Sequence, residues 1–340
     1  MALNFKRESF NARILSVGAY RPPKIVHNND IVEKIDSSDE WIQQRTGIIT
    51  RHYADKNESL IDMALKASEI AIERAGMTKD DIDAVIFATI SYPYQAPSAA
   101  TELIARLNRP HAAAFDISAA CAGFTYGVGL ASDLVRGGTS KYVLVVGSEK
   151  FTDFLNLEDR ATAFIFADGA GAVIIGPAPE PGIGPTIWGS DADSRDAIWM
   201  NPSWLEFKNN PNAPWPFIAQ EGQKVFRWAV FSISKIGNAS IDAAGISPEE
   251  LKAFIPHQAN LRIIETMAKD MKLPDSIVIA DDIRETGNTS AASIPLAMDT
   301  LLNNHPELHG GLALIIGYGA GLVYAGQVVK LPPNPAATSK

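Results

Sequence analysis

Asp116-Ile-Ser-Ala-Ala-Cys-Ala-Gly-Phe-Thr-Tyr-Gly-Val128 is the stretch around which the rest of the chain is organised, and it contains the only cysteine, Cys121. Residues 112–117 are apolar and typical of the end of a buried strand. Residues 124–135 carry apolar side chains every three to four positions and predict a helix. Cys121 is therefore expected on a turn of small residues between a strand and a helix.

That position suits a nucleophile. The free N–H groups and the positive dipole end of the following helix are expected to lower the pKa of the thiol. Gly123 and the neighbouring alanines leave room for a substrate to approach. The alternative is an inert, buried cysteine that acts as a small hydrophobic residue, and only the partners of Cys121 can decide between the two.

The composition indicates a globular protein without metal or nucleic acid. The chain has 340 residues, 46% of them hydrophobic, and a net charge of −9, which disfavours a general nucleic-acid binder. A single cysteine excludes an internal disulfide, and no Cys/His cluster indicates a metal site. The N-terminus lacks an apolar signal core, and the longest apolar run, residues 312–326, is too short and glycine-rich to span a bilayer. We expect a cytoplasmic protein without a membrane segment.

Three pairs of segments repeat in the same order along the two halves of the chain. They are residues 76–86 with 245–255, 142–147 with 312–317, and 168–173 with 318–323. The repeat predicts two homologous α/β halves, each a mixed sheet with helices on both faces, packed as αβαβα layers. A Pro/Gly-rich stretch at 177–185 places the boundary at about 180, giving halves 1–180 and 181–340.

Two further strand-to-helix junctions carry polar residues. His257 follows a predicted strand in Phe254-Ile-Pro-His-Gln-Ala-Asn, and Asn288 opens a helix in Gly287-Asn-Thr-Ser-Ala-Ala-Ser. Alone, His257 would more often be a structural histidine and Asn288 a helix cap. Together with Cys121 at such junctions, where α/β sheets place their chemistry, they predict one active site.

The three side chains suit a carbon–carbon bond-forming reaction on thioesters. A thiolate can attack a thioester and hold the acyl group. Loss of CO2 from a malonyl thioester gives an enolate, which the neutral N–H donors of an imidazole and an amide can stabilise. The backbone N–H groups of Cys121 and of the turn at Ala320 are candidates for the oxyanion hole of the acyl-enzyme.

These motifs resemble β-ketoacyl-acyl-carrier-protein synthase III, the initiating condensing enzyme of bacterial type II fatty-acid synthesis, which has the thiolase-like fold. The matching stretches are Ser38-Asp-Glu-Trp-Ile…Arg-Thr-Gly, Asp116…Ala-Cys-Ala-Gly-Phe-Thr-Tyr, Asp159-Arg, Phe166-Ala-Asp-Gly-Ala-Gly-Ala, Pro256-His-Gln-Ala-Asn-Leu-Arg-Ile, Gly287-Asn-Thr-Ser-Ala-Ala-Ser and Gly317-Tyr-Gly-Ala-Gly. They run from about residue 13 to 329.

The resemblance implies a function and roles for single residues. An acyl-CoA starter would condense with malonyl-acyl-carrier protein through an acylated Cys121, without a cofactor, in a homodimer whose interface includes the strand near Ile117. The residues that it implies are Cys121, His257 and Asn288 for catalysis, Trp41, Arg45 and Arg160 for coenzyme A, Arg262 for docking of acyl carrier protein, and Asn260 for support of the histidine.

Two departures from the family pattern concern the substrate. Ala320 stands where the family commonly has glycine, but its N–H remains. Ala96 falls where some members carry a bulky residue that lines the acyl pocket across the dimer interface, which predicts room for branched or longer starters. The segment 188–223, with Trp188, Trp199, Trp204 and Trp215, is either a surface loop or a wall or lid of the acyl tunnel.

Three other functions compete with this one. They are a related acyltransferase or condensing enzyme of secondary metabolism on the same fold, an inactive acyl-CoA-binding protein, and a thiolase or hydroxymethylglutaryl-CoA synthase. The last two enzymes are disfavoured because they need a second catalytic cysteine or a glutamate base beside the cysteine.

Overall fold

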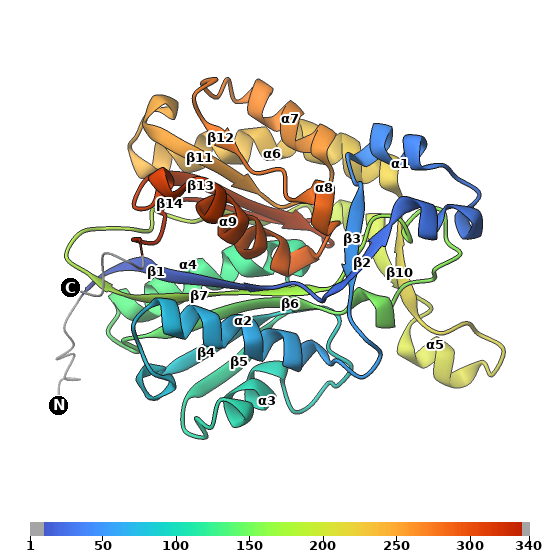
Figure 1. The fold of residues 1–340 in the computed structure, drawn as a ribbon, viewed down its shortest axis with the longest axis horizontal. Helices are drawn as coiled ribbons and strands as arrows, with labels where there is room; N and C mark the ends of the chain where they lie inside the picture. Colours follow the sequence, from blue (N-terminus) through green and yellow to red (C-terminus); the bar gives the residue numbers. More distant parts are fainter. Residues whose placement is uncertain (1–9, 335–340) are drawn as a thin grey trace.

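The computed structural model describes residues 10–334, which fold into five alternating layers of helices and sheets (Figure 1). Helices α2 and α3 cover the outer face of one sheet, and α6 and α7 cover the outer face of the other. Helices α4 and α9 lie between the two sheets and contact both. The predicted αβαβα arrangement is confirmed.

Each sheet has five strands in a mixed arrangement. The first sheet has the order β1-β7-β6-β4-β5, and its strands are β1 (Asn11–Tyr20), β4 (Ala84–Ala88), β5 (Ala113–Ile117), β6 (Val143–Glu149) and β7 (Gly169–Ala178). The second has the order β12-β11-β13-β14-β8, and its strands are β8 (Ile187–Ser190), β11 (Leu251–Pro256), β12 (Val278–Ile279), β13 (Leu312–Gly319) and β14 (Val323–Lys330). Two antiparallel strand pairs lie outside these sheets: β2 (Lys24–His27) with β3 (Thr50–Tyr53), and β9 (Ile198–Asn201) with β10 (Phe217–Gln220).

The helices alternate with the strands along the chain. Their bounds are α1 (Asp39–Thr46), α2 (Leu60–Arg74), α3 (Ala99–Arg106), α4 (Gly123–Arg136), α5 (Trp204–Asn209), α6 (Gly222–Ala244), α7 (Leu261–Asp270), α8 (Ile283–Thr286) and α9 (Ser293–Asn304). In the described range, no helix is both long enough and apolar enough to cross a bilayer.

The two halves repeat the same pairing pattern. In each sheet three neighbouring strands are parallel: β5, β4 and β6 in the first, and β12, β11 and β13 in the second. The two strands that follow, β7 and β1 or β14 and β8, each pair antiparallel with the strand before them. Gly147 on β6 lies opposite Gly171 on β7, whereas Gly317 on β13 lies opposite Ala325 on β14. The sequence match had placed Gly321 in that position, so the third repeated segment is out of register by four residues.

A buried central layer explains why α4 and α9 carry small and apolar side chains. Both helices are enclosed by sheets, so they are apolar around most of their circumference rather than on one stripe. Phe124, Val128, Ile294 and Met298 belong to one core cluster with strand residues of both halves. This packing holds the N-terminal ends of the two helices at fixed positions between the sheets.

Strand β5 differs from the prediction in its exposure. It is an edge strand, paired only with β4, and its residues are exposed or half-buried rather than buried. The side chain of Phe115 is 39% exposed. An apolar, exposed edge strand is a surface on which another chain can pair.

The chain changes sheet between β7, which ends at Ala178, and β8, which begins at Ile187 in the second sheet. Trp188 therefore belongs to a regular strand, since it pairs with Ala325 on β14. The hairpin β9–β10 and helix α5 follow as an addition to the repeat. The division at residue 180 remains a prediction.

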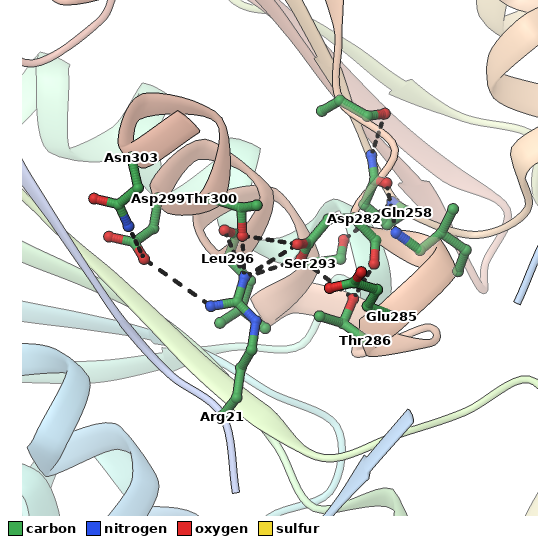
Figure 2. Close-up of polar contacts among 12 residues, drawn as sticks. Arg21, Gln258, Asp282, Glu285, Thr286, Ser293, Leu296, Asp299, Thr300 and Asn303 are labelled. Atoms are coloured by element: carbon green, nitrogen blue, oxygen red, sulfur yellow. Dashed lines mark hydrogen bonds and ion pairs between the residues drawn. The ribbon is translucent and has the colours of Figure 1, made fainter. Parts of the chain in front are cut away.

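A polar network joins the two halves behind the central layer (Figure 2). Arg21, after β1, donates from Nη2 to Asp282 at 3.1 Å, to the Leu296 carbonyl at 3.0 Å and to the Thr300 hydroxyl at 2.6 Å. Asp299 lies 4.0 Å from Arg21 and also pairs with Arg74. The arginines of one half thereby neutralise carboxylates of the other.

Candidate active site

Cys121 lies on a strained turn that precedes α4. It is the central residue of the 3-10 turn η4 (Ala120–Ala122), and the residue before it, Ala120, has a φ of 44°. A positive φ is costly for an alanine. The turn η8 (Ser290–Ala292) before α9 repeats this conformation, with a φ of 48° at Ser290. The turns that open α4 and α9 are therefore counterparts in the two halves.

The Gly-rich turn after β13 fits closely against Cys121. A Cβ at Gly319 would lie 2.8 Å from the Cys121 backbone nitrogen and 3.0 Å from its sulfur. Only glycine allows this approach. The backbone N–H of Cys121 and the turn at Ala320 consequently face the same small volume, which both residues line.

His257 is held at the end of β11 by contacts on three sides. Its backbone N–H donates to the Ile316 carbonyl at 2.7 Å, and its ring meets the ring of Tyr318 edge-on at 5.2 Å. Its Nδ1 lies 2.7 Å from the Ser293 hydroxyl. Burial lowers the pKa of His257 to about 3, so the imidazole is neutral at ordinary pH.

The Ser293 contact fits an imidazole that carries its proton on Nε2. The hydroxyl oxygen accepts a hydrogen bond from the Gln258 backbone N–H at 3.3 Å, and in this arrangement the hydroxyl donates its own proton to Nδ1. Nε2 then holds the imidazole proton. Within residues 10–334, Nε2 has no hydrogen-bond partner of its own, and His257 lines the cavity.

Asn288 is oriented by its own backbone turn. Its Oδ1 accepts from the Ser290 backbone N–H at 2.8 Å, so the amide N–H group is directed elsewhere. The backbone of Asn288 is tied to the chain beside the cavity, because its N–H donates to Ile165 and its carbonyl accepts from Ala167. The amide can therefore donate into the cavity that Asn288 lines.

One cavity of about 500 Å³ collects the three residues predicted from the sequence. Cys121, His257 and Asn288 line it together with Gly319 and Ala320. All three catalytic candidates are buried. His257 and Asn288 do not occupy equivalent positions in the repeat, since His257 follows β11, the counterpart of β4. Asn288 precedes η8, the counterpart of the Cys121 turn.

The expected low pKa of the thiol is wrong for the protein alone. Burial raises the pKa of Cys121 to about 12, with a contribution from the charge of Glu149, although the Ser290 hydroxyl lowers it. Desolvation of a thiolate in an apolar site outweighs the field of one helix terminus. The resting site therefore holds a thiol.

Two family models match this chain. The model of 3-oxoacyl-[acyl-carrier-protein] synthase III matches residues 115–192, and the model of its C-terminal part matches residues 241–331. The curated β-ketoacyl-[acyl-carrier-protein] synthase III 1 of Streptomyces coelicolor is 54% identical over 331 residues, with 94% of this chain and 96% of the relative covered. The synthase III of Streptomyces glaucescens is 53% identical, with 94% and 96% covered.

The chain belongs to the β-ketoacyl-[acyl-carrier-protein] synthase III family.

Solved structures agree with this assignment. The priming β-ketosynthase of the R1128 polyketide pathway has a TM-score of 0.96 at 40% identity, covering 98% of this chain and 100% of its own. The synthase III of Aquifex aeolicus has a TM-score of 0.86 at 33% identity, covering 94% and 100%. The chain is thus a condensing enzyme of fatty-acid synthesis with the thiolase-like fold, and the competing functions are not favoured.

The mouth of the synthase cavity brings together the residues predicted to contact coenzyme A. Trp41 and Arg45 line it, and the guanidinium groups of Arg45 and Arg160 lie 5.6 and 5.2 Å from the centre of the Trp41 ring. Arg262 lines the same mouth and lies over the ring of Phe226 at 5.3 Å. An aromatic face with three cations at one opening suits a nucleotide and phosphate groups.

The side chain of Asn260 makes no hydrogen bond with the histidine in residues 10–334, so the predicted support of His257 is not a direct contact. Its Oδ1 caps α7 by accepting from the Arg262 N–H at 2.9 Å, and its amide donates to the Arg45 carbonyl at 2.9 Å. Because the Asn260 side chain serves as the N-cap of α7, it is not available to bond the imidazole. Ser293 contacts the imidazole instead. It was visible in the sequence as the last residue of the Gly287–Ser293 motif, but nothing in the pattern indicated its partner.

The inner end of the synthase cavity is apolar. It is lined by Ile90, Phe151, Phe166, Ile198 and Ile218. Ile198 and Ile218 come from the β9–β10 hairpin, so the tryptophan-rich segment does form a wall. Its tryptophans do not line the cavity: Trp204 and Trp215 pack against each other at 5.5 Å. Ala96 is exposed and lies outside the cavity of its own chain.

The described part of the synthase contains no group of three or more His, Cys, Asp or Glu residues that could hold a metal ion.

Proposed function

We propose that this synthase condenses an acyl-CoA starter with malonyl-acyl-carrier protein to give a 3-oxoacyl-acyl-carrier protein, CO2 and free coenzyme A. The observation that carries the proposal is the meeting of a thiol, an imidazole and a carboxamide in one cavity whose inner wall is apolar and whose mouth is cationic. The apolar end suits an acyl chain, and the mouth suits the coenzyme.

In the first half-reaction, the sulfur of Cys121 attacks the thioester carbonyl of the acyl-CoA. A C–S bond forms, the bond to the coenzyme sulfur breaks, and the acyl group stays on the enzyme. The negative oxygen of the tetrahedral intermediate is stabilised by the backbone N–H groups of Cys121 and Ala320. The close fit of Gly319 against Cys121 supports this pairing.

In the second half-reaction, malonyl-acyl-carrier protein enters and loses CO2. Its thioester oxygen then carries enolate charge, and Nε2–H of His257 and the amide of Asn288 donate to it. Both groups are neutral, and the neutrality of His257 follows from its burial. The enolate carbon attacks the acyl-Cys121 carbonyl, which forms the new C–C bond and releases the cysteine sulfur.

Different residues at the mouth of the cavity bind coenzyme A and acyl carrier protein. Trp41 stacks on the adenine of coenzyme A, and Arg45 and Arg160 hold that ring and the phosphates. Arg262 docks the acidic acyl carrier protein. Ala96 contributes to the acyl pocket of the partner subunit in a homodimer formed along β5, an arrangement that the exposed edge of β5 supports. No cofactor is required, and the enzyme acts in the cytoplasm.

The test separates the two half-reactions. Incubation with an acyl-CoA should add the acyl mass to Cys121, as read by mass spectrometry, and labelled malonyl-acyl-carrier protein should then release labelled CO2. Cys121→Ala should lose the adduct and keep decarboxylation. His257→Ala should keep the adduct and lose decarboxylation. Full condensing activity in His257→Ala would exclude the proposed role of the imidazole.

A panel of starters tests the pocket. Because Ala96 is small, isobutyryl-CoA and longer acyl-CoA thioesters should be used at rates comparable with acetyl-CoA or faster. A strict preference for acetyl-CoA would contradict this part of the proposal.

A further inference from the structure

Glu149 is a buried acid that the mechanism above does not use. It is the last residue of β6, and its side chain is fully buried. It accepts hydrogen bonds from the Thr89 hydroxyl at 3.0 Å, the Ile90 N–H at 3.2 Å and the Ser91 hydroxyl at 2.5 Å. In the described part of the chain, no Lys, Arg or His side chain forms an ion pair with it. A buried carboxylate without a counter-ion is costly.

Ser290 opens η8, which packs against both β6, where Glu149 lies, and η4, which holds Cys121. It influences both groups, since it lowers the pKa of the Cys121 thiol and that of the Glu149 carboxyl. It is itself buried and makes no hydrogen bond of ordinary geometry with any group in residues 10–334. Buried hydroxyls are rarely unpartnered, so the lack of a hydrogen bond at Ser290 calls for a functional explanation.

Close packing of the two halves creates this arrangement. A Cβ at Gly147 would lie 2.2 Å from the Ala291 carbonyl oxygen, so η8 is pressed directly onto the end of β6. Ser290 therefore lies beside Glu149, two residues along the strand. On its other side η8 packs against η4, which holds Cys121.

The thiol needs a proton acceptor that the rest of the site does not supply. Burial keeps Cys121 protonated at neutral pH. His257 is a poor base, since burial lowers its pKa to about 3 and its Nδ1 is occupied by Ser293. The Tyr318 hydroxyl is also buried, and its pKa is raised. Glu149 lies at the end of β6 against η8, and burial raises its pKa from 4.5 to about 7, which matches a base that works at neutral pH.

We propose that Glu149 accepts the proton of Cys121 through the Ser290 hydroxyl when the cysteine is acylated. The inference rests on the proposed function, because it concerns the nucleophile of that reaction. As the S–H bond of Cys121 breaks, its proton passes to the Ser290 oxygen, and the proton of Ser290 passes to the Glu149 carboxylate. The site keeps its total charge, which avoids creating a second buried anion.

The stored proton returns in the second half-reaction. Sulfur attack displaces the coenzyme as a thiolate, which takes a proton from solvent. When the enolate carbon displaces Cys121 from its acyl group, the released thiolate recovers the proton from Glu149 by the same route. One full cycle consumes one solvent proton, as decarboxylation requires, and returns thiol and carboxylate to their starting states.

The other charged groups near Glu149 have partners of their own. The Lys150 ammonium turns away to the carbonyls of Asp55 and Lys56 and to Asp153 at 3.5 Å. Asp168 has a pKa raised to about 6 by burial and is held by Ala54 and Thr152. The cavity adds Cys121, His257 and Tyr318, together with the arginines Arg45, Arg227 and Arg262. Asp168 titrates close to Glu149, so the test must distinguish them.

The test measures the rate at which iodoacetamide alkylates the protein between pH 5 and 9. Cys121 is the only cysteine, so the whole signal reports its thiolate. The wild-type rate should rise through a step near pH 7, as Glu149 becomes able to accept a proton. Glu149→Gln and Ser290→Ala should both lose the step and react about 10²-fold more slowly at pH 8.

Ser91→Ala is the matched control. It removes one donor to Glu149 and leaves the relay in place, so the step should persist and move to higher pH, because the Ser91 hydrogen bond lowers the pKa of Glu149. A purely structural role for Glu149 would not predict this shift. Asp168 is unchanged in all three variants, so a step that it caused would remain in each of them.

These experiments distinguish failure of the relay from failure of the proposed function. A step that survives in folded Ser290→Ala overturns the relay even if Glu149→Gln does not fold. If acyl-CoA leaves no adduct on wild-type Cys121, the proposed function fails. If the adduct forms and the pH step is the same in wild type and Ser290→Ala, only the relay fails.

Discussion

The Ser293 hydroxyl lies 2.7 Å from Nδ1 of His257 and fixes how this imidazole presents its proton. Ser293 is the first residue of α9 and His257 follows β11, so the contact joins the central helix layer to the second sheet. The hydroxyl also accepts from the Gln258 N–H (Figure 2), and its own proton can be donated to Nδ1 of the imidazole. His257 is thereby kept as a donor through Nε2.

Ser293→Ala should slow decarboxylation and spare acylation. Loss of one hydrogen bond, worth about 1.4 kcal/mol, lets the imidazole populate the wrong tautomer and should reduce CO2 release from malonyl-acyl-carrier protein about tenfold. Acyl adduct formation on Cys121 should be unchanged. Ser293→Thr, which keeps a hydroxyl, should restore most of the rate. An equal loss of both half-reactions would instead indicate a general packing defect.

Trp41→Ala should weaken binding of coenzyme A specifically. The ring is the surface over which Arg45 and Arg160 lie, and stacking of a base on such a ring is worth about 1–3 kcal/mol. KM for an acyl-CoA should therefore rise about tenfold or more. The control substrate is the acyl thioester of N-acetylcysteamine, which lacks the nucleotide, and its acylation rate should not change. A similar loss with both thioesters would contradict adenine stacking.

Arg262→Ala should affect the carrier protein and not the small donor. Arg262 lines the mouth of the cavity, where loss of one charge contact to an acidic partner costs about 1–2 kcal/mol. KM for malonyl-acyl-carrier protein should rise about tenfold, more strongly at low salt, whereas KM for malonyl-CoA should change little. Arg284→Ala, on an exposed arginine paired with Asp281, is the charge-matched control. Equal effects of the two substitutions would exclude a docking role.

Local sequence patterns could predict the three catalytic residues because each follows a strand or opens a helix. Cys121, His257 and Asn288 are marked by small residues, proline or glycine at their own junctions, and the layered repeat brings those junctions together. The sequence also indicated that the turns before α4 and α9 carry residues of the active site. It placed the third repeated segment four residues out of register, because Gly319-Ala-Gly321 resembles Gly169-Ala-Gly171, whereas the structural counterpart of Gly171 is Ala325.

Contacts between the halves could not be predicted in the same way. Glu149 and Ser290 become neighbours only because the backbone of Gly147 packs onto Ala291, and no local pattern encodes that approach. Asn260 was expected to support His257, but its side chain caps α7 and makes no hydrogen bond with the imidazole in the described residues. The lowered thiol pKa was also wrong, because burial is a property of the assembled layers rather than of the helix.

Arg21→Met should destabilise the fold through the network in Figure 2. Its guanidinium is partly exposed, while its partner Asp282 is 6% exposed, so removing the cation leaves a buried carboxylate with only hydroxyl donors. We expect a loss of about 2–3 kcal/mol in the free energy of unfolding, less than for a fully buried pair. Arg284→Met, at an exposed ion pair, should cost less than about 1 kcal/mol. Urea unfolding of both variants measures the difference, and equal stabilities would show that the network does not hold the halves together.

Glu149→Gln should gain stability relative to the wild type as the pH rises. The pKa of Glu149 is raised from its ordinary value of 4.5 to about 7 in the folded protein. Between these values the folded protein binds more protons than the unfolded chain, so this carboxyl makes the wild type less stable as pH increases. The shift corresponds to at most on the order of 3 kcal/mol.

Packing defects in Glu149→Gln would add an offset that does not depend on pH. Asp168 and His257, which also titrate on unfolding, are present in both proteins and cancel in the difference. Urea unfolding at pH 4.5, 6 and 8 should therefore show the free energy of the variant, relative to the wild type, rising through this window and levelling off above pH 7. A difference that stays constant from pH 4.5 to 8 would mean that Glu149 titrates like an exposed glutamate, and it could not then store a proton at neutral pH.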